Sequence, residues 1–199
     1  MTTDTGVVIS GENPGLTLYR AGTDEVILRA SYWRSVYSAG GDGNALLIWV
    51  DPSVMPTGTT APHAIFTDNP AVARIVTDRF TQYFGGFDTL GFGEMDTTNA
   101  RFSQDGDGRW YHRVVCNTGE MVIELTWVEP IAHNLVQNND YTLGPSTYTL
   151  ATVICPCRQA QVMLNGTLIE GDVRVTEGDS TSSSAFLAFS ETWVGPLAG

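Results

Sequence analysis

The feature that most constrains this chain is a succession of short β-branched and aromatic runs, each bounded by turn residues. The runs begin at residues 7–9 and continue to residues 185–193. Runs of this length and composition, bounded by Gly, Pro, Asn, Asp or Ser, are typical of strands in an all-β protein. Turn signals at 40–44 (GGDGN), 117–119 (NTG) and 165–166 (NG) predict antiparallel hairpins. The two-residue NG spacing favours a type I′ turn.

One segment has a different period. The apolar residues of 70–84 recur at helical spacing. Pro70 suits the first helical position, Asp68 or Asn69 can cap the free N–H groups of the first turn, and two glycines after the segment permit a left-handed exit. We therefore expect one amphipathic helix over about 70–84.

A chain of 199 residues made mostly of alternating strands needs its sheet edges hidden, and closure into a barrel hides them. We predict a single all-β domain over 1–199, an antiparallel β-barrel with one α-helix that flanks or plugs it. A two-sheet sandwich is the alternative. No repeat of 20 to 50 residues and no low-complexity linker divides the sequence.

Composition excludes several classes of function. The chain has 22 Asp and Glu residues against 10 arginines and no lysine, and its formal net charge is −12. Schiff-base enzymes and P-loop nucleotide binders both need a lysine, so the sequence excludes both classes. The negative charge disfavours nucleic acid and anionic membrane surfaces as partners. Haem, flavin, pyridoxal and dinucleotide motifs are absent, so we expect no cofactor and a small apolar molecule as the partner.

The thiols, histidines and termini complete this picture. Cys116, Cys155 and Cys157 are an odd number, and the Cys-Pro-Cys spacing is too short for the usual zinc pattern, so we expect buried thiols. The three histidines make no metal motif, and we expect no metal. The first twenty residues do not resemble a signal peptide, so we expect a cytoplasmic protein. No apolar run approaches the roughly 18 to 20 residues of a membrane span, so we expect no membrane as a partner.

Three groups are candidates for acid–base catalysis, because period two places each of them beside apolar residues. His112 lies mid-strand in 110–116, and Glu124 is the one carboxylate on its face of the strand 121–128. Glu191 alternates with the aromatic and aliphatic residues of 187–193 on what we expect to be one face. Desolvation on such a face would raise a glutamate pKa and suit a general acid. A solvated outer face or an arginine partner is the alternative for each glutamate.

Five further residues are candidates for binding the substrate. Tyr32, Trp110, Trp127 and Phe189 supply apolar area, and Arg34 can orient a carboxylate or enolate oxygen. Core packing with an exterior arginine is the alternative. The sequence does not decide which face of each strand is interior.

The C-terminal half carries a family resemblance. Its segments are ARFSQDGDGRWYHRVVCNTGEMVIELTWVEP from residue 100, VMLNGTLIEGDVRV from residue 162 and AFLAFSETWVG from residue 185. An Asp-Gly turn leads into an Arg-Trp strand, a Leu-Thr strand closes on a proline, and a final aromatic strand carries Glu191. These features resemble the β-barrel domain of the lipocalin-like carotenoid 1,2-hydratase (hydroxyneurosporene synthase) superfamily.

That resemblance implies a lipocalin-like barrel around an apolar ligand. It also implies hydration, dehydration or cyclisation of polyene or polyketide substrates, but it transfers no catalytic residue. Members of the superfamily usually carry two such barrels in tandem, whereas this chain has room for one.

Two functions stay open. One is a cofactor-free barrel enzyme of secondary metabolism, an isomerase, cyclase or hydratase/lyase acting on a small apolar metabolite. Glu124, Glu191 or His112 would be its acid or base, with Arg34 or Tyr32 orienting an oxygen. The other is a non-catalytic carrier of a small hydrophobic ligand, or an interaction module such as a subunit of a homo-oligomer. A titratable group with a perturbed pKa beside a space for a reacting atom would favour the enzyme.

Overall fold

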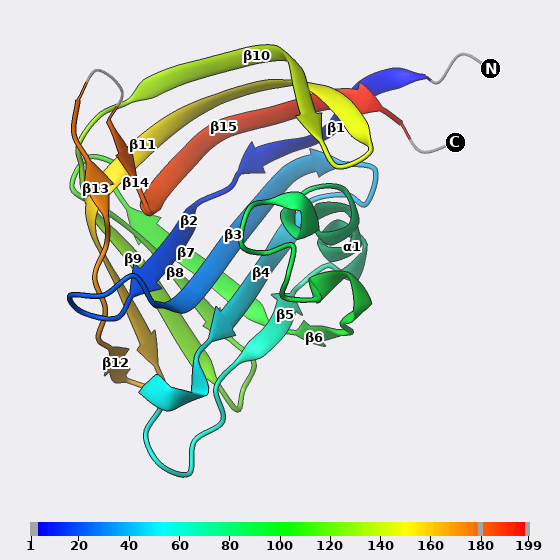
Figure 1. Cartoon of the computed structure of the whole chain (residues 1–199). Coiled ribbons are helices and arrows are strands. Elements are labelled where there is room, and N and C mark those ends of the chain that lie inside the picture. The colour runs from blue at the N-terminus through cyan, green and yellow to red at the C-terminus, as the bar shows by residue number, and fades with distance from the viewer. Residues whose placement is uncertain (1–3, 179–180, 198–199) are drawn as a thin grey trace.

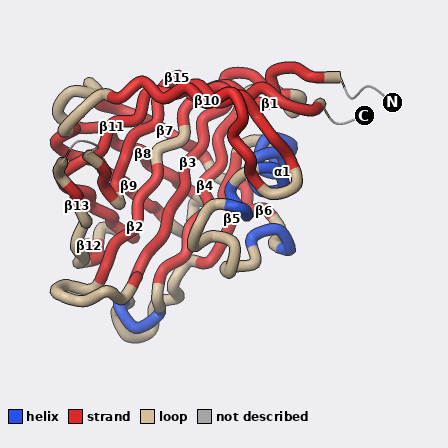
Figure 2. The backbone as a smooth tube through the Cα atoms, turned by 45° about the horizontal axis from the view of Figure 1, so that its top comes forward, coloured by secondary structure: helices blue, strands red, loops and turns tan. Residues whose placement is uncertain are grey.

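The computed structural model describes residues 4–178 and 181–197, and these are mostly β-structure with one short α-helix (Figures 1 and 2). The strands are β1 (Thr5–Glu12), β2 (Gly15–Tyr19), β3 (Val26–Ser38), β4 (Gly43–Val50), β5 (His63–Thr67), β6 (Thr97–Asn99), β7 (Arg101–Gly106), β8 (Tyr111–Asn117), β9 (Val122–Pro130), β10 (Asn134–Leu143), β11 (Ser146–Leu164), β12 (Thr167–Ile169), β13 (Val175–Thr176), β14 (Ser182–Ser183) and β15 (Ala185–Pro196). The helices are α1 (Pro70–Arg79) and the 3-10 turns Pro52–Val54, Thr81–Tyr83 and Phe92–Glu94. Among the described residues, no helix has the length and apolar character that a membrane crossing needs.

Most strands belong to one large, strongly curved sheet in the order β6-β5-β4-β3-β1-β15-β11-β9-β8-β7. β10 and β12 pair with β11, and β2 pairs with β15 and β3. The sheet curls so that β7, β8 and β9 lie behind β2, β3 and β4, which gives a barrel-like shape (Figure 1). The two ends of the order, β6 and β7, are separated only by Ala100. The sheet is mixed, because β6 runs parallel to β5, and the expectation of a purely antiparallel sheet is wrong at that pair.

The three hairpins expected from turn residues are confirmed, since β3–β4, β8–β9 and β11–β12 all pair antiparallel. Asn165 has φ 50° and Gly166 has φ 79°, the two positive angles that a type I′ turn requires. Asn165 adds a tertiary contact, because its Oδ1 accepts a 2.8 Å hydrogen bond from the backbone N–H of Val122.

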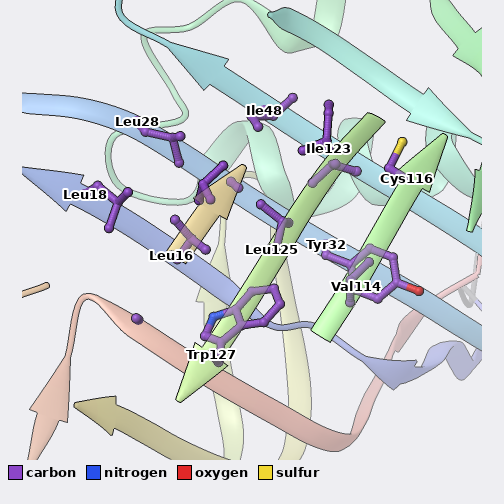
Figure 3. Packing of buried hydrophobic residues seen from close by; sticks show 14 of the residues in the cluster. Leu16, Leu18, Leu28, Tyr32, Ile48, Val114, Cys116, Ile123, Leu125 and Trp127 are labelled. Atoms are coloured by element: carbon purple, nitrogen blue, oxygen red, sulfur yellow. The ribbon is translucent and has the colours of Figure 1, made fainter. Parts of the chain in front are cut away.

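The curved sheet encloses one core and supports a second on its outer surface. The inner core contains, among others, Leu125 and Trp127 of β9, which lie on the same side of their strand, and Tyr32 of β3 (Figure 3). Cys116, Cys155 and Cys157 are buried free thiols of this core, as expected. The outer core lies between the sheet and α1, and its largest side chains include Trp33, Phe80 and Trp193.

The helix flanks the sheet against β3, β4 and β5 and is shorter than expected. Asn69 caps it, with its Oδ1 accepting from the N–H of Ala71 at 3.0 Å. α1 ends at Arg79 because Phe80 leaves the helical conformation (φ −132°, ψ −76°) and packs on Trp33 and Trp193. The expected helix is completed by the 3-10 turn Thr81–Tyr83 and by Phe84, whose backbone is extended.

A β-bulge in β15 reverses the two faces of that strand. Phe189 pairs with Val153 and Thr192 with Ala151, so β15 has one more residue than β11 in this interval. The extra residue is Ser190, which is exposed and has φ 51°. Phe189 therefore packs on the inner core, whereas Glu191 and the following Trp193 lie on the outer side. The expectation that Leu187, Phe189, Glu191 and Trp193 share one face is wrong for this reason.

Candidate functional site

A cavity of about 370 Å³ lies on the outer side of the sheet, not inside the barrel-like core. Its floor comes from β2, β3, β11 and β15, and its walls come from β10 and the segment 84–87 that follows the helical turns. In Figure 1, β10 and the α1 region stand on either side of β2 and β3. The apolar lining residues are Leu16, Ala30, Phe84, Phe87, Val136, Tyr141, Leu150, Ile154, Phe186 and Trp193. This volume and lining are typical of a small-molecule pocket.

Glu191 is the carboxyl group of this cavity, and only 4% of the residue is exposed. The Ser190 bulge turns it toward the cavity, where the Nε1–H of Trp193 donates to its Oε1 at 2.7 Å. The Nδ2–H of Asn13 donates to the same oxygen at 3.3 Å. Both donors bond Oε1, and the hydroxyl of buried Thr152 is the third hydrogen-bonding group beside the carboxyl group.

Burial raises the pKa of Glu191 to about 7, although the hydrogen bonds from Trp193, Asn13 and Thr152 favour the ionised form. Desolvation dominates because a buried carboxylate loses its water and gains no cation in return. Glu191 therefore exists as a mixture of acid and anion near neutral pH. A group poised in this way serves equally as a proton donor and a proton acceptor.

A short polar network fixes Asn13 below the carboxyl group. The hydroxyl of Ser31 donates to Asn13 Oδ1 at 3.1 Å, and the backbone N–H of Asn13 donates to the carbonyl of Ala188 at 3.0 Å. Thr152, also buried, lines the cavity beside Glu191. At another part of the lining is Arg29, whose Nη1 donates to Thr17 Oγ1 at 3.2 Å. The cavity thus combines apolar walls with two chemically different polar groups.

Four of the other sequence candidates lie in the inner core. His112 is buried with its ring edge-to-face on Phe189 (5.8 Å between centroids) and 6.0 Å from Trp127. Burial lowers the pKa of His112, and its Nε2 has no hydrogen-bond partner among the described residues. The Nε1–H of Trp127 donates to the carbonyl of Gly15 at 2.9 Å, and the hydroxyl of Tyr32 donates to Asn44. The structure brings these aromatic residues together, but on the opposite side of the sheet from Glu191.

The remaining three candidates lie outside both places. Glu124 faces outward and forms an ion pair with Arg113 on the neighbouring strand, which is the arginine-partner alternative and not the interior position that an acid–base role required. Trp110 precedes β8 and is 67% exposed, so it does not share the buried face of His112, as alternation continued back to residue 110 would require. Arg34 has an exposed side chain and pairs with Glu12 at 3.2 Å. The outward face of a β-sheet can carry a charged pair such as Glu124–Arg113 because water covers it.

Sequence reasoning identified Glu191 and missed the rest of the cavity, including Asn13, Arg29 and Thr152. A glycine pair between two phenylalanines at 84–87 was the one local signal, since such a segment can fold back over an apolar surface. Among the described residues, no group of three His, Cys, Asp or Glu side chains converges in a way that could hold a metal ion.

No family model, curated protein or solved structure matches this chain. The resemblance to the carotenoid 1,2-hydratase superfamily therefore stays a prediction.

Proposed function

We propose that the outer cavity binds a small, largely apolar metabolite and that Glu191 exchanges a proton with it. The observation that carries this proposal is a fully buried carboxyl group, with a pKa of about 7, in the wall of a mostly apolar cavity. Perturbed titratable groups in pockets are enriched at catalytic sites, because general acids and bases work best with a pKa near the operating pH.

The geometry suits a cofactor-free isomerase, cyclase or hydratase/lyase. Trp193 and Asn13 hold Oε1, so Oε2 is the oxygen that gives or takes the proton. In an isomerisation, the carboxylate removes a proton from one carbon of the substrate and the resulting acid returns it to another, which leaves Glu191 unchanged. The apolar walls exclude water, and exclusion of water protects the charged intermediate from competing proton transfer.

The alternative function is a carrier, and the internal polar network favours it. Asn13 and Ser31 satisfy one another and Glu191, as buried polar groups do in a purely structural role.

An interaction module is the third candidate function, because β10 is a sheet edge and its Leu135 is 75% exposed. Exposed apolar side chains on an edge strand suit pairing with another chain, a second copy included.

We further propose that the sheet is a closed, lipocalin-like barrel. β6 pairs with β5 and β7 pairs with β8, and Ala100, between β6 and β7, donates its N–H to the carbonyl of Thr67 at 2.8 Å. The segment 97–106 thereby bridges the two ends of the strand order. Slow amide hydrogen exchange at Ala100, comparable with that of the central strands, would support closure; fast exchange would contradict it.

Two experiments test the functional proposal. Native mass spectrometry of the protein from its own cells identifies the bound metabolite and the subunit number. Turnover of that metabolite is then compared for the wild type, Glu191→Gln and Glu124→Gln. We expect Glu191→Gln to lose about 10² or more in turnover, the usual worth of general acid–base catalysis, whereas Glu124→Gln retains it.

Other outcomes of these experiments would point to another catalytic residue or to the carrier function. Full turnover by Glu191→Gln would remove this residue from the mechanism. Loss in Glu124→Gln alone would move the chemistry to the outer face of β9. A metabolite that the wild type binds but never transforms would favour the carrier.

A further inference from the structure

Arg29 is a half-buried cation in the wall of the cavity, and no carboxylate pairs with it in the described part of the chain. Its one side-chain partner there is the hydroxyl of Thr17. Six other arginines of this acidic protein do form ion pairs, namely Arg20, Arg34, Arg74, Arg113, Arg158 and Arg174. A partly desolvated guanidinium without an anion keeps unused capacity for a charge-assisted hydrogen bond.

The backbone of the cavity wall is shaped around this guanidinium. Gly86 has φ +84°, and a Cβ built at Gly86 would lie 2.2 Å from Arg29 Cζ. Only a glycine allows the loop to approach the side chain so closely. Phe84 and Phe87, on either side of the glycine pair, form part of the apolar lining. Arg29 is therefore held between Thr17 on the sheet and Gly86 on the loop, at the surface of the cavity.

We infer that the cavity takes an amphipathic organic anion, with its negatively charged group at Arg29 and its apolar body along the phenylalanine-lined wall. This inference rests on the proposed ligand-binding role of the cavity and adds the class of ligand. The planar guanidinium can bind two oxygens of a carboxylate or a similar group at once. The field of a protein with net charge −12 opposes an anion at most of the surface, so a local cation is needed to select one.

A matched pair of fluorescent probes tests this inference. 8-Anilinonaphthalene-1-sulfonate is an apolar anion, and N-phenyl-1-naphthylamine has the same rings without the sulfonate. Both are titrated into the wild type, Arg29→Gln and Arg101→Gln at one pH and ionic strength. Arg101 is exposed on β7 outside the cavity, so its variant removes the same charge elsewhere. We expect Arg29→Gln to weaken the sulfonate probe about tenfold, and neither variant to change the neutral probe more than about twofold.

Two further variants keep the test decisive. Gly86→Ala retains the charge but displaces the guanidinium, and we expect it to weaken the sulfonate probe as well, even if Arg29→Gln folds poorly. Ile154→Trp fills the cavity and is expected to abolish binding of both probes. Binding that survives in Ile154→Trp would place the probes elsewhere and overturn the inference.

The outcomes distinguish binding of a ligand in the cavity from selection of an anion by Arg29. If Arg29→Gln weakens both probes equally, or weakens the sulfonate probe no more than Arg101→Gln does, the anion inference is overturned and the cavity as a binding site stands. If neither probe binds the wild type, the binding site itself is overturned.

Discussion

Replacement of Glu191 by glutamine has a consequence for stability that can be worked out from the structure. The substitution keeps the volume of the side chain and an oxygen that accepts the hydrogen bonds from Trp193 and Asn13. It removes the titration. In the folded protein the pKa of the Glu191 carboxyl group is about 7, whereas the ordinary glutamate pKa, which applies to the unfolded chain, is 4.5.

The sign and size of the effect follow from that difference. Because the folded pKa is the higher one, the contribution of Glu191 to stability is fully present below pH 4.5 and is lost as the pH rises to 7. The loss is about 1.4 kcal/mol per pH unit, or about 3 kcal/mol over the whole interval. Above pH 7 both states are ionised and nothing more is lost. Glu191→Gln escapes the loss, so it gains on the wild type by about 3 kcal/mol between pH 4.5 and pH 7.

Urea denaturation of both proteins at pH 4.5, 6, 7 and 8 measures this gain. Subtraction of the two free energies of unfolding at each pH cancels the other titrating groups, which the proteins share. Ile154→Val is the matched control, because it changes a neutral residue of the same cavity and its difference from the wild type should not vary with pH. A difference between Glu191→Gln and the wild type that stayed constant from pH 4.5 to 7 would refute the reasoning.

Three further changes have defined outcomes. Trp193→Phe removes the indole donor that favours the ionised form of Glu191, so the pH at which stability is lost should rise in the same denaturation series; an unchanged or lower midpoint would contradict the assigned hydrogen bond. Gly166→Val should cost about 1 to 3 kcal/mol from backbone strain alone, because the added Cβ meets no atom within 4 Å, and an unchanged melting temperature would count against the turn. Trp127→Phe leaves the carbonyl of Gly15 without its donor, and chemical denaturation should show a loss of at least about 1 kcal/mol; no loss would mean that the carbonyl finds another donor.

Local patterns predicted most of the strands and their faces. His112 shares a buried face with Val114, and Trp127 with Leu125, because regular strands keep period two along their length. Which of the two faces was interior could not be known, since both carried apolar residues. The place of Glu124 stayed undecided for that reason, and only its ion pair with Arg113 on the neighbouring strand shows that it lies on the outer face.

The helix and β15 show where a local pattern fails. The apolar period of 70–84 continues past Arg79, but the indole of Trp33 donates to the hydroxyl of Thr81 at 3.0 Å and the chain turns there. In β15, a serine at φ 51° makes the bulge, and serine is not a residue that signals a left-handed conformation. A tertiary contact marks the first position, and only the pairing of β15 with β11 shows the second.

The candidate site was predictable only in part, because residues far apart in the sequence build it. Glu191 was found from its apolar neighbours, although two of them, Leu187 and Phe189, precede the bulge and face the other side of the sheet. Asn13, its hydrogen-bond partner, is 178 positions away. No local pattern links such residues, and only the pairing of β15 with β1, β2 and β11 brings them together.

The place of β15 within the sheet also governs how the protein reaches its folded state. β15 comes last among the described strands, yet it lies between β1 and β11, and the hydroxyls of Ser10 and Thr192 meet across 182 positions. Chains dominated by such distant pairings fold slowly, on the scale of roughly milliseconds to seconds. Until β15 docks, β1 and β11 each expose an unpaired edge, and an exposed edge invites pairing with other molecules. Glu191 lies on that same strand, so its carboxyl group reaches the cavity only once β15 has paired with its neighbours.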